Sequence, residues 1–357
     1  MIKEHMLIIR FSAIGDVAMT VPVVYSLACQ YPSLRISVLS KPFARPLFEY
    51  MPANVDFMEA DIKREYRGIK GLNALYRRLV AKNLTAIADF HDILRSNYLR
   101  LRFNLDQFKV AHINKHRSGR RRLTDQNHKV MAQQPTSFQN YADVLARLGY
   151  PVKLEFTSLF SPEGGNLAEL PTAIGIRKPG EEWIGIAPFA GHKGKIYPEA
   201  QMEAVIRLLL KRHPHCRIFL FGGKGHEMDV INEWSKAHSQ CVNASAMLNG
   251  IHDELILMSH LDAMLSMDSA NMHIASLVAT PVVSVWGATH PYAGFLGWNQ
   301  DPANVVQIDM PCRPCSAYGK KPCHRGDYAC INNITPTMIV DKLDRVLNNK
   351  KGVTSRQ

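Results

Sequence analysis

Residues 7–16 read LIIRFSAIGD, and this stretch decides the fold class. Its first five residues form a short, mostly apolar run, which is typical of a buried parallel strand. Gly15 and Asp16 then lead into the helical pattern of residues 17–31. A strand that ends in a glycine turn and passes into a helix is the repeating unit of a parallel sheet covered by helices.

The same alternation of strand and helix continues along the chain. Further strand-like runs are residues 35–39, 86–90 and 109–113 in the first half, and 183–188, 217–221, 263–267 and 282–286 in the second. Amphipathic helical patterns such as residues 199–213 separate them. We therefore predict an α/β fold built from two doubly wound halves, each with helices on both faces of its sheet.

Chain length and turn residues set the expected domain boundaries. A chain of 357 residues exceeds what one hydrophobic core usually organises. Turn residues dominate from about residue 156 to 179, and no helical period persists there. We expect an N-terminal domain, a linker, a C-terminal domain and a closing helix with a tail, over residues 1–160, 161–180, 181–335 and 336–357.

Composition and charge narrow the classes of function. The chain is 46% apolar and 21% charged, which is ordinary for a globular protein and argues against long disorder. No stretch approaches the ~20 apolar residues of a membrane span, and the N-terminal run is too short for a signal peptide, so we expect a cytoplasmic protein. The formal net charge of +12 favours an anionic partner, which can be nucleic acid, a phosphorylated glycan or a membrane surface.

Asp16 is the candidate catalytic base. In open parallel sheets ligands bind beyond the carboxyl ends of the strands, and Gly15 and Asp16 directly follow the first strand. A carboxylate there suits general-base catalysis on a sugar hydroxyl. Aspartate is also a favoured residue at a helix start, so a structural role stays open beside the catalytic one.

Four motifs that follow strands in the second half suggest one nucleotide-diphosphate site. Small residues and helix N-termini offer N–H groups to phosphates, and lysines add positive charge. Glu227 and Asp268 can accept hydrogen bonds from ribose and sugar hydroxyls, although each motif alone also fits an ordinary loop or helix start. The candidate donor-binding residues are Gly15, Gly191, Lys193, Gly222, Gly223, Glu227, Asp268, Ser269, Ala270, His273, Gly287 and Thr289, and Lys195 is the second candidate catalytic residue.

The order of these motifs resembles glycosyltransferase family 9, the ADP-heptose:lipopolysaccharide heptosyltransferase family, over nearly the whole chain. Four segments carry the resemblance: SAIGD at residues 12–16, KIYPE at 195–199, DSANMH at 268–273 and WGAT at 286–289. They are similar to the family's N-terminal aspartate motif, its K-x-W-P-E segment, its D-S/T-G-x-x-H signature and its F/Y-G-x-T turn. Tyr197 stands where tryptophan is usual and Ala270 where glycine is usual, which leaves the donor sugar open.

The resemblance implies a GT-B fold, in which two Rossmann-like domains face a cleft. It implies that Asp16 is the catalytic base, that Lys195 contacts the donor phosphates, that Glu227 binds the ribose and that Asp268 binds the donor sugar. The expected reaction is an inverting transfer of a heptose or related sugar, from ADP-heptose to a lipopolysaccharide core or other cell-surface saccharide. GT-B enzymes typically need no metal, so no cofactor is expected for catalysis.

Two basic stretches of the first half are candidate acceptor-binding surfaces by the same resemblance. Arginine forks suit the carboxylates and phosphates of an anionic, lipid-linked saccharide, although a solvated charged loop explains such stretches as well. Peripheral contact with the cytoplasmic face of the inner membrane would follow from such an acceptor. The candidate residues are Arg64, Arg67, Lys70, Arg117, Arg120 and Arg121.

Four of the seven cysteines cluster near the C-terminus, at Cys312, Cys315, Cys323 and Cys330. The first pair has the spacing of zinc ligands, but the later gaps are not those of a common zinc finger. A structural zinc site, reduced buried thiols and facultative disulfides therefore all stay open. A catalytic metal is not expected, because no D-x-D pair follows the strands.

Two alternative functions also account for part of the sequence. A nucleic-acid-binding protein with a zinc segment would explain the charge but not the ordered motifs after strands, so no nucleic-acid partner is expected. Another nucleotide-sugar enzyme, such as an epimerase, would use the same fold and would form product without an acceptor. We retain the glycosyltransferase as the first hypothesis, because it explains both a donor site and an opposing carboxylate.

Overall fold

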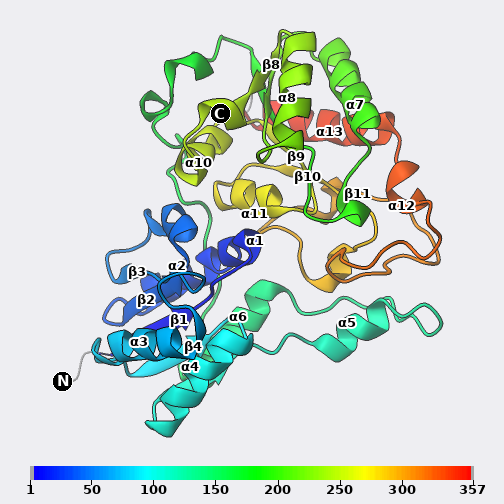
Figure 1. Ribbon diagram of the computed structural model, residues 1–357. Coiled ribbons are helices and arrows are strands. Elements are labelled where there is room, and N and C mark those ends of the chain that lie inside the picture. Colours follow the sequence, from blue (N-terminus) through cyan, green and yellow to red (C-terminus); the bar gives the residue numbers. More distant parts are fainter. Residues whose placement is uncertain (1–3, 355–357) are drawn as a thin grey trace. The chain divides into compact units, whose positions relative to one another are not determined.

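The computed structural model describes residues 4–354 and confirms the predicted α/β class. The chain forms two compact units, each built on its own parallel sheet (Figure 1). Unit 1 comprises residues 4–116 and Pro135–Leu159, and unit 2 comprises Arg117–Gln134 and residues 160–354. Among the residues that the structure describes, no helix combines the length and apolar character that crossing a bilayer requires.

The sheet of unit 1 has the strand order β3-β2-β1-β4-β5, and every paired strand is parallel. The order reverses between β1 and β4, where an open α/β sheet offers room for a ligand. Residues 10–16 leave β1 at this point. The strands are β1 (His5–Ile9), β2 (Arg35–Ser40), β3 (Val55–Glu59), β4 (Ala86–Asp89) and β5 (Lys109–His112).

The helices of unit 1 pack their apolar sides on this sheet. They are α1 (Ile14–Ala18), α2 (Val21–Gln30), α3 (Gly68–Val80), α4 (Leu94–Leu105) and α6 (Ser137–Arg147). The sequence predicted one helix over residues 17–31, but the structure divides it between α1 and α2. The hydroxyl of Thr20 donates to the carbonyl of Val17 at 2.7 Å, and Pro22, which has no N–H group, occupies the first turn of α2.

The sheet of unit 2 has the order β11-β10-β9-β6-β7-β8, again with parallel pairs. Here the order reverses between β6 and β9. Candidate motifs follow β6, β7, β9 and β10, so their backbones leave the sheet at its carboxyl edge. The strands are β6 (Glu182–Ala187), β7 (Cys216–Leu220), β8 (Cys241–Asn243), β9 (Ala263–Met267), β10 (Val282–Val285) and β11 (Val305–Val306).

The helices of unit 2 surround a separate apolar core. That core includes buried residues of β6, β7, β9 and β10 and of the C-terminal helix α13 (Pro336–Thr354), which packs against α7 (Figure 1). The expected closing helix is thus part of the packing of unit 2. The other helices are α5 (Arg117–Leu123), α7 (Glu199–Arg212), α8 (His226–Ala237), α9 (Ala244–Met247), α10 (Ile251–Ser259), α11 (Ala270–Leu277) and α12 (Ala329–Asn332).

Residues 117–134 differ from the expected domain division, because they pack with unit 2. The reason is the side chain of Arg120, which is 6% exposed. Its guanidinium lies 4.4 Å from the ring centroid of Phe295 and donates to the hydroxyl of Tyr318 at 2.9 Å. The Nζ atom of Lys129 also donates to the carbonyl of Pro314 at 3.0 Å. These contacts hold a segment from the first half of the sequence on the C-terminal unit.

Candidate active site

Asp16 lies in the first turn of α1, directly after the buried strand β1. Its Oδ2 atom forms an ion pair with the guanidinium of Arg10 at 2.7 Å and accepts a hydrogen bond from the N–H of Ala13 at 3.2 Å. The side chain of Asp16 is 32% exposed, whereas that of Arg10 is 8% exposed. The carboxylate therefore has both the helix-capping role and an accessible, oriented position after β1.

Arg10 is a functional candidate that the sequence reasoning missed. In the sequence, Arg10 lies within a mostly apolar run, which gives no sign of a contact with Asp16. In the structure its guanidinium also donates to the carbonyl of Phe90 at 2.7 Å, so the end of β4 fixes its position beside Asp16. An arginine held in this way attracts the neighbouring carboxylate and fixes its orientation.

His91 is the second residue of unit 1 that sequence reasoning missed. Its Nδ1 atom accepts a hydrogen bond from the N–H of Phe11 at 3.2 Å, and its side chain is buried. Burial, with the positive charges of Arg10 and Lys115, lowers the pKa of His91 to about 3. The imidazole is therefore neutral at physiological pH and supports the loop that carries Asp16.

Lys195, Asp268 and Thr289 form the centre of the candidate donor site in unit 2. The Nζ atom of Lys195 lies 3.0 Å from Oδ2 of Asp268, and the hydroxyl of Thr289 donates to the same oxygen at 2.7 Å. The three residues come from the loops after β6, β9 and β10. Tertiary structure thus brings together three motifs that lie 73 and 21 positions apart in the sequence.

Two glycines allow the loops after β6 and β10 to touch. The N–H of Ala288 donates to the carbonyl of Gly194 at 2.8 Å. A Cβ atom on Gly287 would lie 2.4 Å from that carbonyl oxygen, which is closer than atoms can approach. Gly287 is therefore required for close backbone packing, and Gly194, which was not singled out from the sequence, is its partner.

The remaining residues after β6 are more open. A Cβ atom on Gly191 would meet no atom within 4 Å, so the backbone here is accessible. Lys193 begins the short 3-10 helix Lys193–Lys195, and its ammonium lies 5.0 Å from the ring centroid of Tyr328. The structure places Lys193 near an aromatic ring and Lys195 at the carboxylate, so the two lysines have different environments.

Glu227 closes the turn after β7. Its Oε2 atom accepts a hydrogen bond from the N–H of Gly223 at 2.6 Å, and the N–H of Gly222 donates to the hydroxyl of Ser245 at 2.7 Å. Glu227 lies in the first turn of α8, where an acidic residue is also favoured by the helix dipole. The turn holds the carboxylate at the carboxyl edge of the sheet.

The start of α11 follows β9 and Asp268. Ser269 precedes the helix in an extended conformation, its hydroxyl lies 3.2 Å from the hydroxyl of Ser266, and Ala270 is the first helical residue. This leaves the first N–H groups of α11 beside Asp268. His273 is 6% exposed and lies on the buried part of the helix, which is the environment of a packing residue.

The six basic acceptor candidates are divided equally between the two units. Arg64, Arg67 and Lys70 are exposed around the start of α3 in unit 1. Arg117 and Arg121 are exposed on α5, which belongs to unit 2, whereas Arg120 is buried. The guanidinium of Arg120 contacts Phe295 and Tyr318 of unit 2, so we interpret this residue as an anchor of α5 and not as an acceptor ligand.

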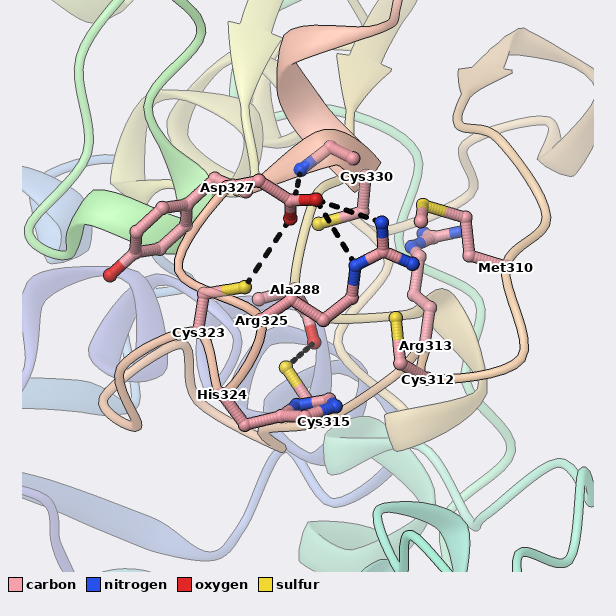
Figure 2. Close-up of a pocket in the computed structure, with 12 residues that line it drawn as sticks. Ala288, Met310, Cys312, Arg313, Cys315, Cys323, His324, Arg325, Asp327 and Cys330 are labelled. Carbon is pink, nitrogen blue, oxygen red and sulfur yellow. Dashed lines mark hydrogen bonds and ion pairs between the residues drawn. The ribbon is translucent and has the colours of Figure 1, made fainter.

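The four C-terminal cysteines line one small pocket around Arg313 (Figure 2). Burial lowers the pKa of Arg313 to about 10, and its guanidinium donates to the carbonyls of Thr289 and Ile308 at 2.9 and 3.0 Å. Burial also raises the pKa of Cys330 to about 11, so this thiol is protonated at neutral pH. The cysteine segment thus supports the loop that carries Thr289.

Zinc binding by this segment receives no support from the geometry. In the part of the chain that the structure describes, no three His, Cys, Asp or Glu side chains are grouped as metal ligands would be. The Sγ atom of Cys315 lies 3.9 Å from the carbonyl oxygen of Ala288, and that of Cys323 lies 3.9 Å from Oδ1 of Asp327 (Figure 2). These thiols therefore contact oxygen atoms of the protein.

The family model and the sequence relatives agree on one family. Residues 72–324 match the description "Glycosyltransferase family 9 (heptosyltransferase)". Lipopolysaccharide heptosyltransferase 3 of Escherichia coli is 26% identical over 325 residues, which cover 84% of this chain and 88% of the relative. Lipooligosaccharide heptosyltransferase 2 of Haemophilus influenzae is 24% identical over 361 residues, which cover 96% and 99%.

The fold agrees with this family. The solved structure of the E. coli ADP-heptose lps heptosyltransferase II superimposes with a TM-score of 0.70 at 18% identity, and the match covers 97% of this chain and 99% of that chain. Its GT-B architecture has two parallel sheets, as in the two units described above. The family match spans more than half of the sequence, so the chain belongs to glycosyltransferase family 9 and is a glycosyltransferase.

Proposed function

We propose that this glycosyltransferase moves a heptose, with inversion, from ADP-heptose to an anionic, lipid-linked saccharide of the lipopolysaccharide core. The observation that carries the donor assignment is the cluster of Lys195, Asp268 and Thr289 at the carboxyl edge of the unit 2 sheet. The names of the relatives support a heptose, and the name of the E. coli structure supports ADP-heptose as the donor.

In the proposed mechanism, unit 2 binds the donor and Asp16 of unit 1 acts on the acceptor. The ammonium of Lys195 attracts the diphosphate, and the N–H groups at the start of α11 donate to its oxygens. Glu227 accepts hydrogen bonds from the ribose hydroxyls, and Asp268 accepts them from the sugar. When the donor binds, the ammonium of Lys195 leaves the carboxylate of Asp268 and pairs with the diphosphate.

The chemical step is a single displacement at the anomeric carbon. The acceptor oxygen forms a bond to this carbon while the bond from the carbon to the diphosphate oxygen breaks. The carboxylate of Asp16 takes the proton of the acceptor hydroxyl, and the lysine stabilises the negative charge that grows on the leaving diphosphate. No metal or other cofactor takes part in the proposed reaction.

The nucleotide is tested by ligand-linked stabilisation. ADP should raise the unfolding temperature more than UDP or GDP, since a ligand at a hundred times its dissociation constant adds about 2.7 kcal/mol to the free energy of unfolding. Lys195→Ala should lose most of this stabilisation, whereas Lys211→Ala, an exposed lysine at the end of α7, should keep it. Equal shifts with all three nucleotides would contradict the ADP assignment.

The reaction class is tested with acceptor. Incubation with ADP-heptose and a lipopolysaccharide-core saccharide should give an extended saccharide and ADP in equal amounts. An enzyme that altered the nucleotide sugar without acceptor would instead be an epimerase. We also propose that the enzyme works at the cytoplasmic face of the membrane that holds the acceptor, because the acceptor is lipid-linked and the donor is a nucleotide sugar.

A further inference from the structure

Helix α4 in unit 1 is apolar on two opposite faces. Its inner face contributes Ser96, Leu99 and Phe103, which are fully buried against the core of unit 1. Its outer face carries Leu94, Leu101 and Leu105, which are 86%, 57% and 68% exposed. Single exposed leucines are common on protein surfaces, but three on the solvent side of one helix need an explanation.

The three exposed leucines form a straight row. Their spacing of seven and four residues places them within roughly 40° around the helix axis, because each residue turns an α-helix by about 100°. The row extends about 16 Å along the helix at 1.5 Å per residue. Tyr98 lies beside the row and points its hydroxyl to Oδ1 of Asn73 at 2.8 Å. We call Leu94, Leu101 and Leu105 the leucine row.

Positive charge borders the leucine row on the side of α3. Arg95 is exposed on α4 next to Leu94. Arg102, seven residues further on, lies 4.6 Å from the ring centroid of Tyr76 and donates to Asn73 of α3. Arg77, which is exposed, follows Tyr76 on α3. Figure 1 shows α3 and α4 as neighbouring helices of unit 1.

Nearby carboxylates offset only part of this positive charge. Asp106 at the end of α4 accepts a hydrogen bond from the hydroxyl of Tyr76. Asp92 before the helix forms an ion pair with Arg100 at 3.4 Å, and the same arginine pairs with Asp89 at 3.2 Å. Asp106 is exposed and keeps its negative charge, but three arginines, Arg77, Arg95 and Arg102, outnumber it. The surface around the row is therefore apolar along one line and has more positive than negative charge beside it.

We propose that the leucine row of α4 inserts into the interface of an anionic lipid bilayer, with Arg95 and Arg77 against the lipid phosphates. A helix that lies in the membrane plane has this combination of an apolar face and basic residues beside it. Arginine side chains can reach the phosphates from a shallow depth, while the leucines contact the acyl chains. The formal net charge of +12 adds a long-range attraction to the same surface.

This inference goes beyond the proposed reaction, since it concerns a surface that contributes no residue to the candidate active site. It rests on exposed side chains of unit 1 and on the net charge of the whole chain. A protein that binds vesicles but not ADP would contradict the proposed reaction only, and a protein that transfers sugar without binding vesicles would contradict the docking only.

The test is flotation of the full chain with lipid vesicles. The protein should float with vesicles of phosphatidylglycerol and phosphatidylethanolamine. With vesicles of phosphatidylcholine alone it should remain unbound in the bottom fraction. Leu94→Gln combined with Leu101→Gln and Leu105→Gln should reduce binding tenfold or more. Arg77→Glu combined with Arg95→Glu should reduce it at low salt and have less effect at high salt.

A matched control removes three exposed apolar side chains elsewhere. Val130, Met131 and Ile176 of unit 2 are 46%, 47% and 90% exposed, and their triple exchange to Gln should leave vesicle binding unchanged. Equal unfolding temperatures and equal stabilisation by ADP would show that the leucine variant is folded.

Three outcomes would overturn the proposal. The first is undiminished binding of the leucine variant to anionic vesicles. The second is equal binding of the unaltered protein to phosphatidylcholine. The third is a dimer in solution that the leucine exchange dissociates, since the row would then be covered by a second copy of the chain.

Discussion

At the scale of single residues, Asp16 has two functions that the structure makes compatible. It caps the start of α1 through the N–H of Ala13, and the same oxygen pairs with Arg10. Neither contact buries the carboxylate, which keeps about a third of its side chain accessible. Sequence reasoning treated the capping and catalytic interpretations as competitors, although one side chain can do both.

Asp16→Asn should separate chemistry from donor binding. The amide keeps the size of the carboxylate but takes up no proton, so turnover should fall by ~10²–10⁴ while stabilisation by ADP stays near that of the unaltered protein. Steady-state rates and thermal shifts measure the two effects. Asp143→Asn, on the exposed side of α6, is the control and should change neither. Full activity of the Asp16 variant would refute its role as the base.

The pKa of His91, lowered by burial to about 3, predicts acid sensitivity. The folded state disfavours the protonated imidazole, whereas an unfolded chain takes up the proton near pH 6.5, so stability is fully present above pH 6.5 and falls as pH decreases toward 3. The slope should be about 1.4 kcal/mol per pH unit for this one group. Denaturant unfolding across this range should show a weaker slope in His91→Gln.

At the scale of elements, each strand that the sequence does not reveal lies at a sheet edge, although the edge strand β5 was predicted. Most inner strands are buried on both sides, and their apolar runs were predicted within one or two residues. The missed strands β3, β8 and β11 lie at sheet edges. Asp56, for example, is the second residue of β3 and is exposed, so β3 lacks the continuous apolar run that is typical of an inner strand.

Contact between the loops after β6 and β10 depends on Gly287, and this can be tested. Gly287→Ala places a Cβ atom 2.4 Å from the carbonyl oxygen of Gly194, so the loops must separate. We expect a loss of about 1–3 kcal/mol in the free energy of unfolding and weaker stabilisation by ADP. Gly191→Ala meets no atom within 4 Å and should leave stability nearly unchanged. Equal stability of the two variants would contradict the close packing.

At the scale of the whole molecule, each unit has its own sheet and its own apolar core. Candidate donor ligands after β6, β7, β9 and β10 belong to unit 2, and Asp16 belongs to unit 1. Binding of the donor alone should therefore slow hydrogen exchange in unit 2 and not in unit 1.

Hydrogen exchange with and without ADP tests this division. Nucleotide should slow exchange in the loops around Gly191, Gly223, Ser269 and Gly287 of unit 2, because bound phosphates and ribose restrict those backbones. Exchange in β1, β2 and β4 should stay the same. Protection confined to the sheet of unit 1 would contradict the assignment of the donor site.

The sequence by itself determined the α/β class, the inner strands and the family, because buried parallel strands and glycine turns leave strong local patterns. Only the tertiary structure decided that Lys195 and Thr289 both contact Oδ2 of Asp268, that Arg10 and His91 support the loop of Asp16, and that Arg120 anchors residues 117–134 to unit 2. The physical reason is that most of these contacts join residues far apart in the chain, and that the short-range pair of Arg10 with Asp16 depends on the distant carbonyl of Phe90, which holds the guanidinium. Local sequence does not indicate which distant groups will contact a charged side chain or an aromatic ring.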